Sequence, residues 1–109
     1  MKYCCTNSQR KDTCYFEFQK GKFNDKHWLS DSLCLNADIF DDLGLYEFFS
    51  KVLSEFNYYG ITEIDKEKWE QIKSESKKSG CAVKDVIDEI DSWINSSFDT
   101  IDKITILGI

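Results

Sequence analysis

Few side chains in this sequence could carry out acid–base or nucleophilic chemistry. The only histidine, His27, lies in a polar stretch, and a Cys–His nucleophile pair is formally available with Cys14 or Cys34. No third group that would orient the imidazole can be identified, and a catalytic histidine normally needs one. Adjacent acids such as Asp41 and Asp42 do not converge on one substrate atom without a pocket. We therefore expect a solvated loop histidine and no catalytic residues.

The cysteines do not have the spacing of a metal site or of a disulfide framework. There are five of them: Cys4, Cys5, Cys14, Cys34 and Cys81. Their number is odd and no C-x-x-C pair occurs, although zinc sites are usually built from such pairs. Motifs for nucleotides, hydrolysis and calcium are also missing. We expect reduced thiols, no metal and no cofactor, with Cys14 and Cys34 buried as small apolar groups.

The charge of the chain is uneven along its length. The 109 residues carry a net charge of −6, and residues 37–65 hold seven acids against one lysine. With a single arginine, the chain lacks the basic face that a nucleic-acid binder needs. No apolar run is long enough to span a membrane, and the first residues do not resemble a signal peptide. We expect a cytoplasmic protein that binds neither nucleic acid nor membrane and whose field attracts a basic protein.

Two strands and three helices are predicted before the C-terminal segment. Alternating apolar residues predict a strand over 13–18 and a second over 28–35. Helical spacing of apolar residues predicts helices over 45–56, over 66–79 with Asp65 as N-cap, and over 83–94, fraying at residues 95–97. Asp41, Asp42 or Gly44 is expected to cap the first of these helices.

The end of the chain predicts one more strand, and with it the fold class. Residues 100–109 are rich in isoleucine, and a terminal segment this apolar should be inserted in a sheet rather than left at its edge. The order is then β-β-α-α-α-β in one domain over residues 1–109. We expect an α+β fold with about three helices on one face of a small antiparallel or mixed sheet. Trp93, Ile104 and Ile106 are predicted to lie on its buried face.

The order and spacing of four segments resemble a known group of proteins. The segments are Ile61-Thr62-Glu63-Ile64, Trp69-Glu70-Gln71-Ile72, residues 86–93 and residues 104–109. In this arrangement, residues 40–109 resemble the small immunity proteins of bacterial contact-dependent growth inhibition and related polymorphic toxin systems. The most distinctive part is the ending Thr105-Ile106-Leu107-Gly108-Ile109.

The resemblance implies a cytoplasmic protein that binds the C-terminal domain of a cognate toxin in a 1:1 complex. Such toxins are often basic nucleases, and we expect a ribonuclease whose active site or substrate groove is blocked. The family carries no catalytic motif, so no catalytic residues are transferred. The expected toxin-binding residues come from the charge pattern instead: Asp38, Asp41, Asp42, Glu47, Asp85, Asp88 and Glu89. The alternative is a small cytosolic enzyme or a generic protein-interaction adaptor.

Overall fold

A five-stranded antiparallel sheet forms the frame of the molecule. In the computed structural model, which describes residues 1–109, the strands are β1 (Cys4–Thr6), β2 (Tyr15–Lys20), β3 (Leu33–Asn36), β4 (Ile61–Asp65) and β5 (Lys103–Leu107). Their spatial order is β1-β3-β2-β5-β4, and every neighbouring pair is antiparallel. The α+β prediction is confirmed.

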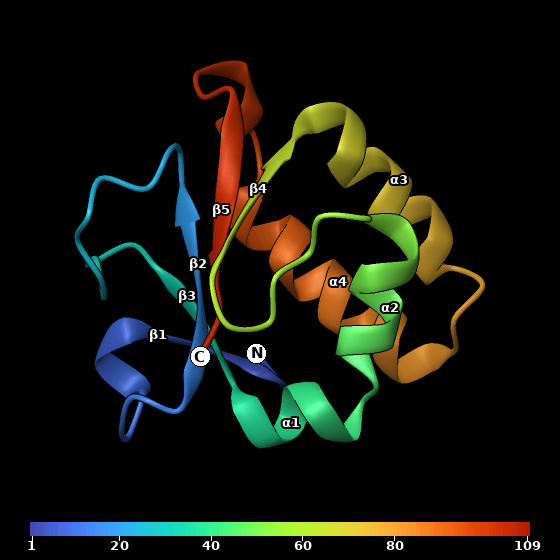
Figure 1. The fold of residues 1–109 in the computed structure, drawn as a ribbon, viewed down its shortest axis with the longest axis horizontal. Helices are drawn as coiled ribbons and strands as arrows, with labels where there is room; N and C mark the ends of the chain where they lie inside the picture. Colours follow the sequence, from blue (N-terminus) through green and yellow to red (C-terminus); the bar gives the residue numbers. More distant parts are fainter.

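The helices lie together on one side of this sheet, as the sequence predicts (Figure 1). They are α1 (Ala37–Asp42), α2 (Leu45–Val52), α3 (Lys66–Ser76) and α4 (Cys81–Ile94), with single 3₁₀ turns at η1 (Asn7–Gln9) and η2 (Ser97–Asp99). The expected order β-β-α-α-α-β therefore lacks three elements, which are β1, α1 and β4. β1 and α1 are too short, at three and six residues, to show a hydrophobic period.

Local capping explains where the helices begin. Asn36 ends β3 and its side-chain oxygen accepts the N–H of Asp38 at 2.9 Å, so α1 starts directly after the strand. Gly44, with a φ of 69°, separates α1 from α2 and is the N-cap of α2. Asp65 caps α3 as predicted, because its carboxylate accepts the N–H of Lys68 at 2.8 Å. α2 ends at Val52, four residues before the predicted end of the helix.

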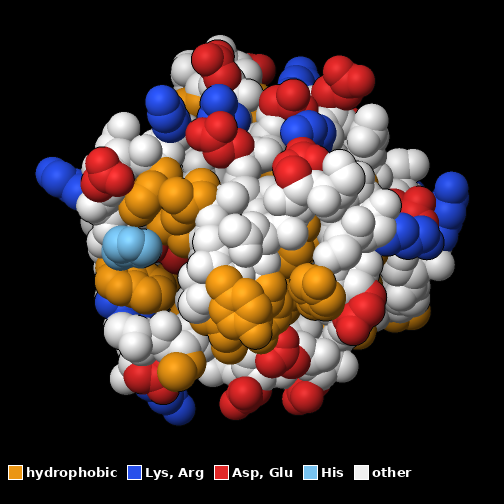
Figure 2. All heavy atoms as spheres, viewed as in Figure 1, with side chains coloured by type: hydrophobic (Ala, Val, Ile, Leu, Met, Phe, Trp, Pro, Cys, Tyr) orange, Lys and Arg blue, Asp and Glu red, His pale blue; other side chains and the backbone are white.

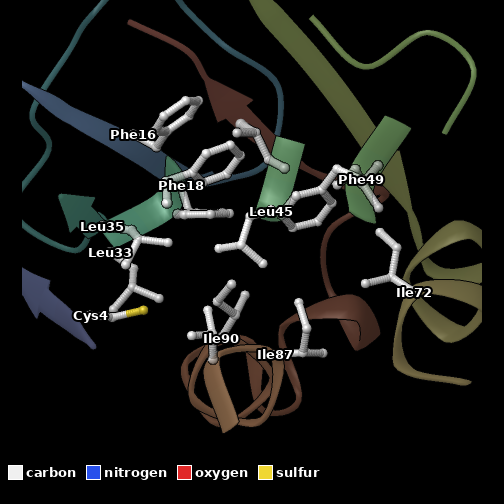
Figure 3. Packing of buried hydrophobic residues seen from close by; sticks show 14 of the residues in the cluster. Cys4, Phe16, Phe18, Leu33, Leu35, Leu45, Phe49, Ile72, Ile87 and Ile90 are labelled. Carbon is white, nitrogen blue, oxygen red and sulfur yellow. The ribbon is translucent and has the colours of Figure 1, made fainter. Parts of the chain in front are cut away.

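The hydrophobic core lies between the sheet and the helices (Figure 3). In that view Leu45 and Phe49 of α2 lie on one side of the cluster and Phe18 of β2 on the other, while Ile90 approaches from α4. Aromatic rings stack through the centre, with the ring centroids of Phe16 and Phe40 3.8 Å apart. The apolar stripes predicted for all three helices are therefore the surfaces that they bury.

The opposite face of the sheet is also covered, which the sequence does not predict. Alternation in residues 13–18 predicts a half-buried strand, but all residues from Tyr15 to Gln19 are buried. The segment between β2 and β3, residues 21–32, folds back over this second face. Figure 1 shows it on the side of the sheet away from the helices. The expectation of a half-buried strand was wrong because a loop, not solvent, lies against the outward side chains.

A buried carboxylate organises this loop. Glu17 is 1% exposed, and its Oε2 accepts the N–H of Trp28 at 2.7 Å and the hydroxyl of Ser32 at 2.5 Å. The φ of Trp28 is 59°, which interrupts an extended chain. The strand predicted over 28–35 is consequently only Leu33–Asn36. Residues 28–32, the first half of the predicted strand, form a loop that supplies hydrogen-bond donors to Glu17.

Strand β5 is inserted at the interior of the sheet, as its apolar sequence predicts. It pairs with β2 on one side and with β4 on the other. Ile104 and Ile106 are both buried in the core, as expected, whereas Trp93 is only half-buried. The indole N–H of Trp93 donates to the carbonyl of Asp31 at 2.9 Å, so this side chain lies at the margin of the core.

Truncation of a core residue in β5 should destabilise the domain strongly. We expect Ile106→Ala to lower the free energy of unfolding by about 2–5 kcal/mol, because it leaves a cavity in a fully packed region. Trp93→Ala should cost less than this, since part of its indole remains in solvent. Ile61→Ala, at a side chain that is 52% exposed, is the control and should cost less than about 0.5 kcal/mol. Urea unfolding measures all three, and an unchanged midpoint for Ile106→Ala would contradict the assignment.

Candidate functional site

A groove with acidic and aromatic walls lies where α1, α2 and the segment before β4 meet. Its volume is about 560 Å³, and it is lined by Asp41, Tyr46, Glu47, Phe56, Asn57, Tyr58 and Tyr59. We call this set the tyrosine groove. Figure 2 shows hydrophobic side chains gathered on this part of the surface with acidic side chains along their border. Tyr46 is 46% exposed and Tyr59 is 78% exposed, so both rings are available for contact.

Packing beneath the groove fixes the position of its walls. Phe40 of α1 stacks on Phe49 of α2 and on Phe56, with ring centroids 6.0 and 6.1 Å away. Above these buried rings, Tyr46 and Tyr58 meet edge to face at 5.7 Å. The exposed tyrosines therefore rest on a rigid aromatic layer that belongs to the hydrophobic core.

A hydrogen bond joins the two sides of the groove. The phenol of Tyr58 donates to the Oδ1 of Asp41 at 2.7 Å. This hydrogen bond, followed by burial and by the negative charge of Asp41, raises the pKa of Tyr58 to about 12. The phenol therefore remains protonated, and a donor, at neutral pH.

Residues 108–109 hold the backbone of the segment that precedes β4 by two hydrogen bonds. The N–H of Gly108 donates to the carbonyl of Gly60 at 2.8 Å, and the N–H of Ile109 donates to the carbonyl of Tyr58 at 3.1 Å. A Cβ at position 108 would lie 2.0 Å from the carbonyl oxygen of Tyr58, so only glycine fits there. The main chain of the groove is thus attached to the end of the interior strand.

Four of the seven predicted site residues are brought together here. Asp41 and Glu47 line the groove, and Asp38 and Asp42 are exposed on the same short helix as Asp41. The charge pattern of the sequence does not predict the aromatic half of the site, above all Tyr46, Tyr58 and Tyr59. The pair Tyr58-Tyr59 could have indicated this half of the site, because it follows a predicted helix and does not belong to any apolar period.

The three predicted acids of α4 lie elsewhere. Asp85 and Asp88 are exposed, and Asp88 accepts from Lys84 at 2.7 Å beside a separate polar hollow between α3 and α4. Glu89 is half-buried, and its carboxylate accepts the backbone N–H groups of Lys2, Tyr3 and Cys4, the closest at 2.9 Å. Glu89 thus fixes the start of β1, so we leave the α4 acids out of the candidate site.

His27 lies next to a buried acid that the sequence analysis did not single out. The side chain of His27 is 56% exposed, and its Nδ1 is 3.7 Å from the Oε1 of Glu17. That oxygen is buried without a hydrogen-bond partner, while Oε2 accepts from the covering loop and from the side-chain amide of Gln19 on β2. The hydroxyl of Ser32 and the N–H of Trp28 both donate to Glu17, so this carboxylate holds the loop that carries His27.

The cysteines are dispersed over both faces of the sheet. Cys4 points into the core, whereas Cys5 lies opposite Cys34 on the other face. Burial raises the pKa of Cys4, and burial together with the nearby Cys5 and Glu17 raises the pKa of Cys34 to about 12. Cys14 is exposed, which corrects the expectation that it is buried with Cys34. High thiol pKa values disfavour the reactive thiolate.

No group of three or more metal-binding side chains is arranged around a common point, and no helix is long and apolar enough to cross a membrane. In comparisons with protein-family models, curated proteins and solved structures, nothing matches this chain. The geometry of the tyrosine groove is therefore the main guide to function.

The Tyr58–Asp41 hydrogen bond can be tested by titration. We expect Asp41→Ala to lower the pKa of Tyr58 from about 12 toward 10, because the acceptor and its charge are both removed. In the wild type, the raised pKa adds stability that is present below pH 10 and is lost as the pH rises toward 12. NMR of ¹³Cζ-labelled tyrosine resolves the five phenols. Asp42→Ala should leave Tyr58 unchanged, and a shift equal to that of Asp41→Ala would refute the assignment.

Thiol counting tests the predicted redox state. We expect five reactive thiols after denaturation without reductant, and no stoichiometric zinc in protein purified without chelator. In the native chain the exposed Cys14 and Cys81 should react first and the buried Cys4 and Cys34 last. The double variant Cys14→Ser/Cys81→Ser should lose only the fast phase. Fewer than five thiols in denaturant would show a disulfide.

Proposed function

We propose that this chain is an immunity protein that binds a basic toxin domain and blocks it. The observation that carries the proposal is the tyrosine groove, which combines exposed tyrosine rings with acidic side chains in one concave surface. Tyrosine is among the residues enriched at the centres of protein interfaces, where it contributes both apolar area and a hydrogen-bonding group.

The acids around the groove determine which kind of partner fits. Asp41 and Glu47 line it, Asp38 and Asp42 extend the negative surface along α1, and residues 37–65 carry a net charge of −6. Such a field accelerates encounter with a basic surface and repels nucleic acid. The partner that we propose is therefore a basic protein domain.

A nuclease toxin meets this description because it needs basic side chains to bind the phosphates of its substrate. An acidic groove that contacts those side chains competes directly with RNA or DNA. We propose that inhibition arises in this way, in a 1:1 complex in the cytoplasm, with a ribonuclease as the expected target. The order of segments that resembles immunity proteins supports the same proposal and requires no catalytic step from this chain.

The experiment uses the C-terminal domain of the protein encoded directly upstream of this chain, which is where the proposal expects the toxin gene. The two proteins should co-purify, and the chain should abolish nuclease activity of that domain at an equimolar ratio. Absence of both binding and inhibition would overturn the proposal. A toxin gene that is absent from the neighbouring reading frame would favour the adaptor alternative.

Charge reversal at Glu47 in the groove and at Asp42 on the adjoining helix α1 should slow association. We expect Asp42→Lys/Glu47→Lys to lower the association rate about tenfold or more at low salt, with a smaller effect on dissociation. The wild-type rate should fall as salt rises to physiological strength. Stopped-flow or surface-based kinetics against ionic strength measures both effects.

The matched control is Asp85→Lys/Asp88→Lys on α4, which changes the net charge by the same +4, from −6 to −2. Neither residue lines the tyrosine groove, so this variant should slow association much less. If the α4 variant slowed association more than the groove variant, the partner would dock on α4 and the assigned surface would be wrong.

A further inference from the structure

The two outer strands of the sheet, β1 and β4, differ in how their free edges are treated. An edge strand presents backbone N–H and C=O groups that have no partner in the sheet and can pair with another chain. Because hydrogen-bonded and non-hydrogen-bonded pairs alternate along an antiparallel ladder, the register shows which groups point outward.

The edge of β1 is closed. The N–H of Ala37 donates to the carbonyl of Cys14, so the backbone groups of Ala37 face the β2 side of β3. Backbone groups alternate in direction along a strand, so those of Cys34 face β1, where Cys5 lies opposite. The backbone N–H and C=O groups of Cys4 and Thr6 therefore point away from β3, toward the free edge of the sheet. Their N–H groups donate to Glu89 at 2.9 Å and to Gln9 at 3.0 Å, so side chains of this chain already occupy that edge.

The edge of β4 is open. The Gly108 N–H donates to the Gly60 carbonyl, so the backbone groups of Gly60 face β5. By alternation, the backbone groups of Thr62 and Ile64 also face β5. Those of Ile61 and Glu63 therefore point away from the sheet. No acceptor within the chain bonds to the N–H of Ile61 or of Glu63. Ile61 is also 52% exposed.

We propose that β4 receives an extended segment of the basic partner as a sixth strand of the sheet. The inference rests on the proposed function and assigns its binding mode, because strand addition supplies main-chain hydrogen bonds while neighbouring pockets select side chains. Tyr58 and Tyr59 of the tyrosine groove precede β4 by way of Gly60. A segment that pairs with β4 and extends past Ile61 would therefore run toward these two tyrosines, and we place both surfaces in one binding site.

Charge distinguishes this partner from a second copy of the chain. β4 carries Glu63 and Asp65 and no basic residue. Two copies paired antiparallel along the whole strand would place Glu63 opposite its own counterpart, and like charges directly opposite each other are destabilising. The Glu63 carboxylate lies 3.3 Å from the Nζ of Lys103, yet 41% of its side chain remains exposed. A lysine or arginine on an incoming strand would contact it favourably.

Amide hydrogen exchange tests the inference with the upstream toxin domain as the probe. In the free chain we expect the amides of Ile61 and Glu63 to exchange rapidly and those of Thr62 and Ile64 slowly. In the complex, exchange at Ile61 and Glu63 should slow by about tenfold or more, because both amides gain acceptors. A complex that forms while these two amides stay unprotected overturns the strand addition and leaves the proposed function standing. Failure of the wild-type chain to bind overturns both.

A proline variant gives an independent measurement. Glu63→Pro removes an outward N–H without removing a bond to β5, and proline is tolerated on edge strands. Glu63→Ala is the matched control, since it removes the same carboxylate and keeps the N–H. The proline variant should bind the toxin domain several-fold more weakly than the alanine variant, with circular dichroism confirming that both are folded. Equal affinities of two folded variants, or a dimer of the free chain in sedimentation, would refute the proposal.

Discussion

The pairing of β5 with strands on both its sides is the constraint on which the rest of the structure depends. One neighbour, β2, comes from the first fifth of the chain, and the other, β4, comes from its middle. Without β5 the sheet would divide into β1-β3-β2 and an isolated β4, and the helices would have no continuous apolar surface to cover. Such non-local pairing costs loop-closure entropy before it contributes stability, so this domain should fold more slowly than a helical protein of equal length.

A carboxylate buried on the opposite face of the sheet stabilises a second, polar layer. The Oε2 of Glu17 accepts hydrogen bonds from Trp28, Leu29 and Ser32. These donors take the place of the water that would otherwise surround the carboxylate. Charge-assisted hydrogen bonds of this kind offset the cost of removing a carboxylate from water. The molecule therefore has an apolar core on one face of the sheet and a hydrogen-bonded loop on the other.

Periodic patterns predicted the parts of this fold that are long and one-sided. The apolar faces of α2 and α4 follow from residue spacing, because burial on one side imposes a period. The interior position of β5 follows from its apolar composition. The loop over Glu17 could not be predicted, since a glutamate within an alternating strand is equally consistent with a solvated face. The acidic half of the site followed from charge counting, whereas Tyr58 and Tyr59 depend on a turn whose position is set by contacts with residues 108–109.

Position 108 does not tolerate a side chain, whereas positions at the rim of the groove do. No side chain fits at this position, because the carbonyl of Tyr58 already occupies the space. The exposed rings of Tyr46 and Tyr59, by contrast, extend into solvent from a backbone whose course is set by buried contacts and by the sheet. Substitutions at the rim of the groove can therefore accumulate at little cost in stability. The shape and charge of the groove can therefore change by substitution at its rim while the backbone that holds it keeps its course.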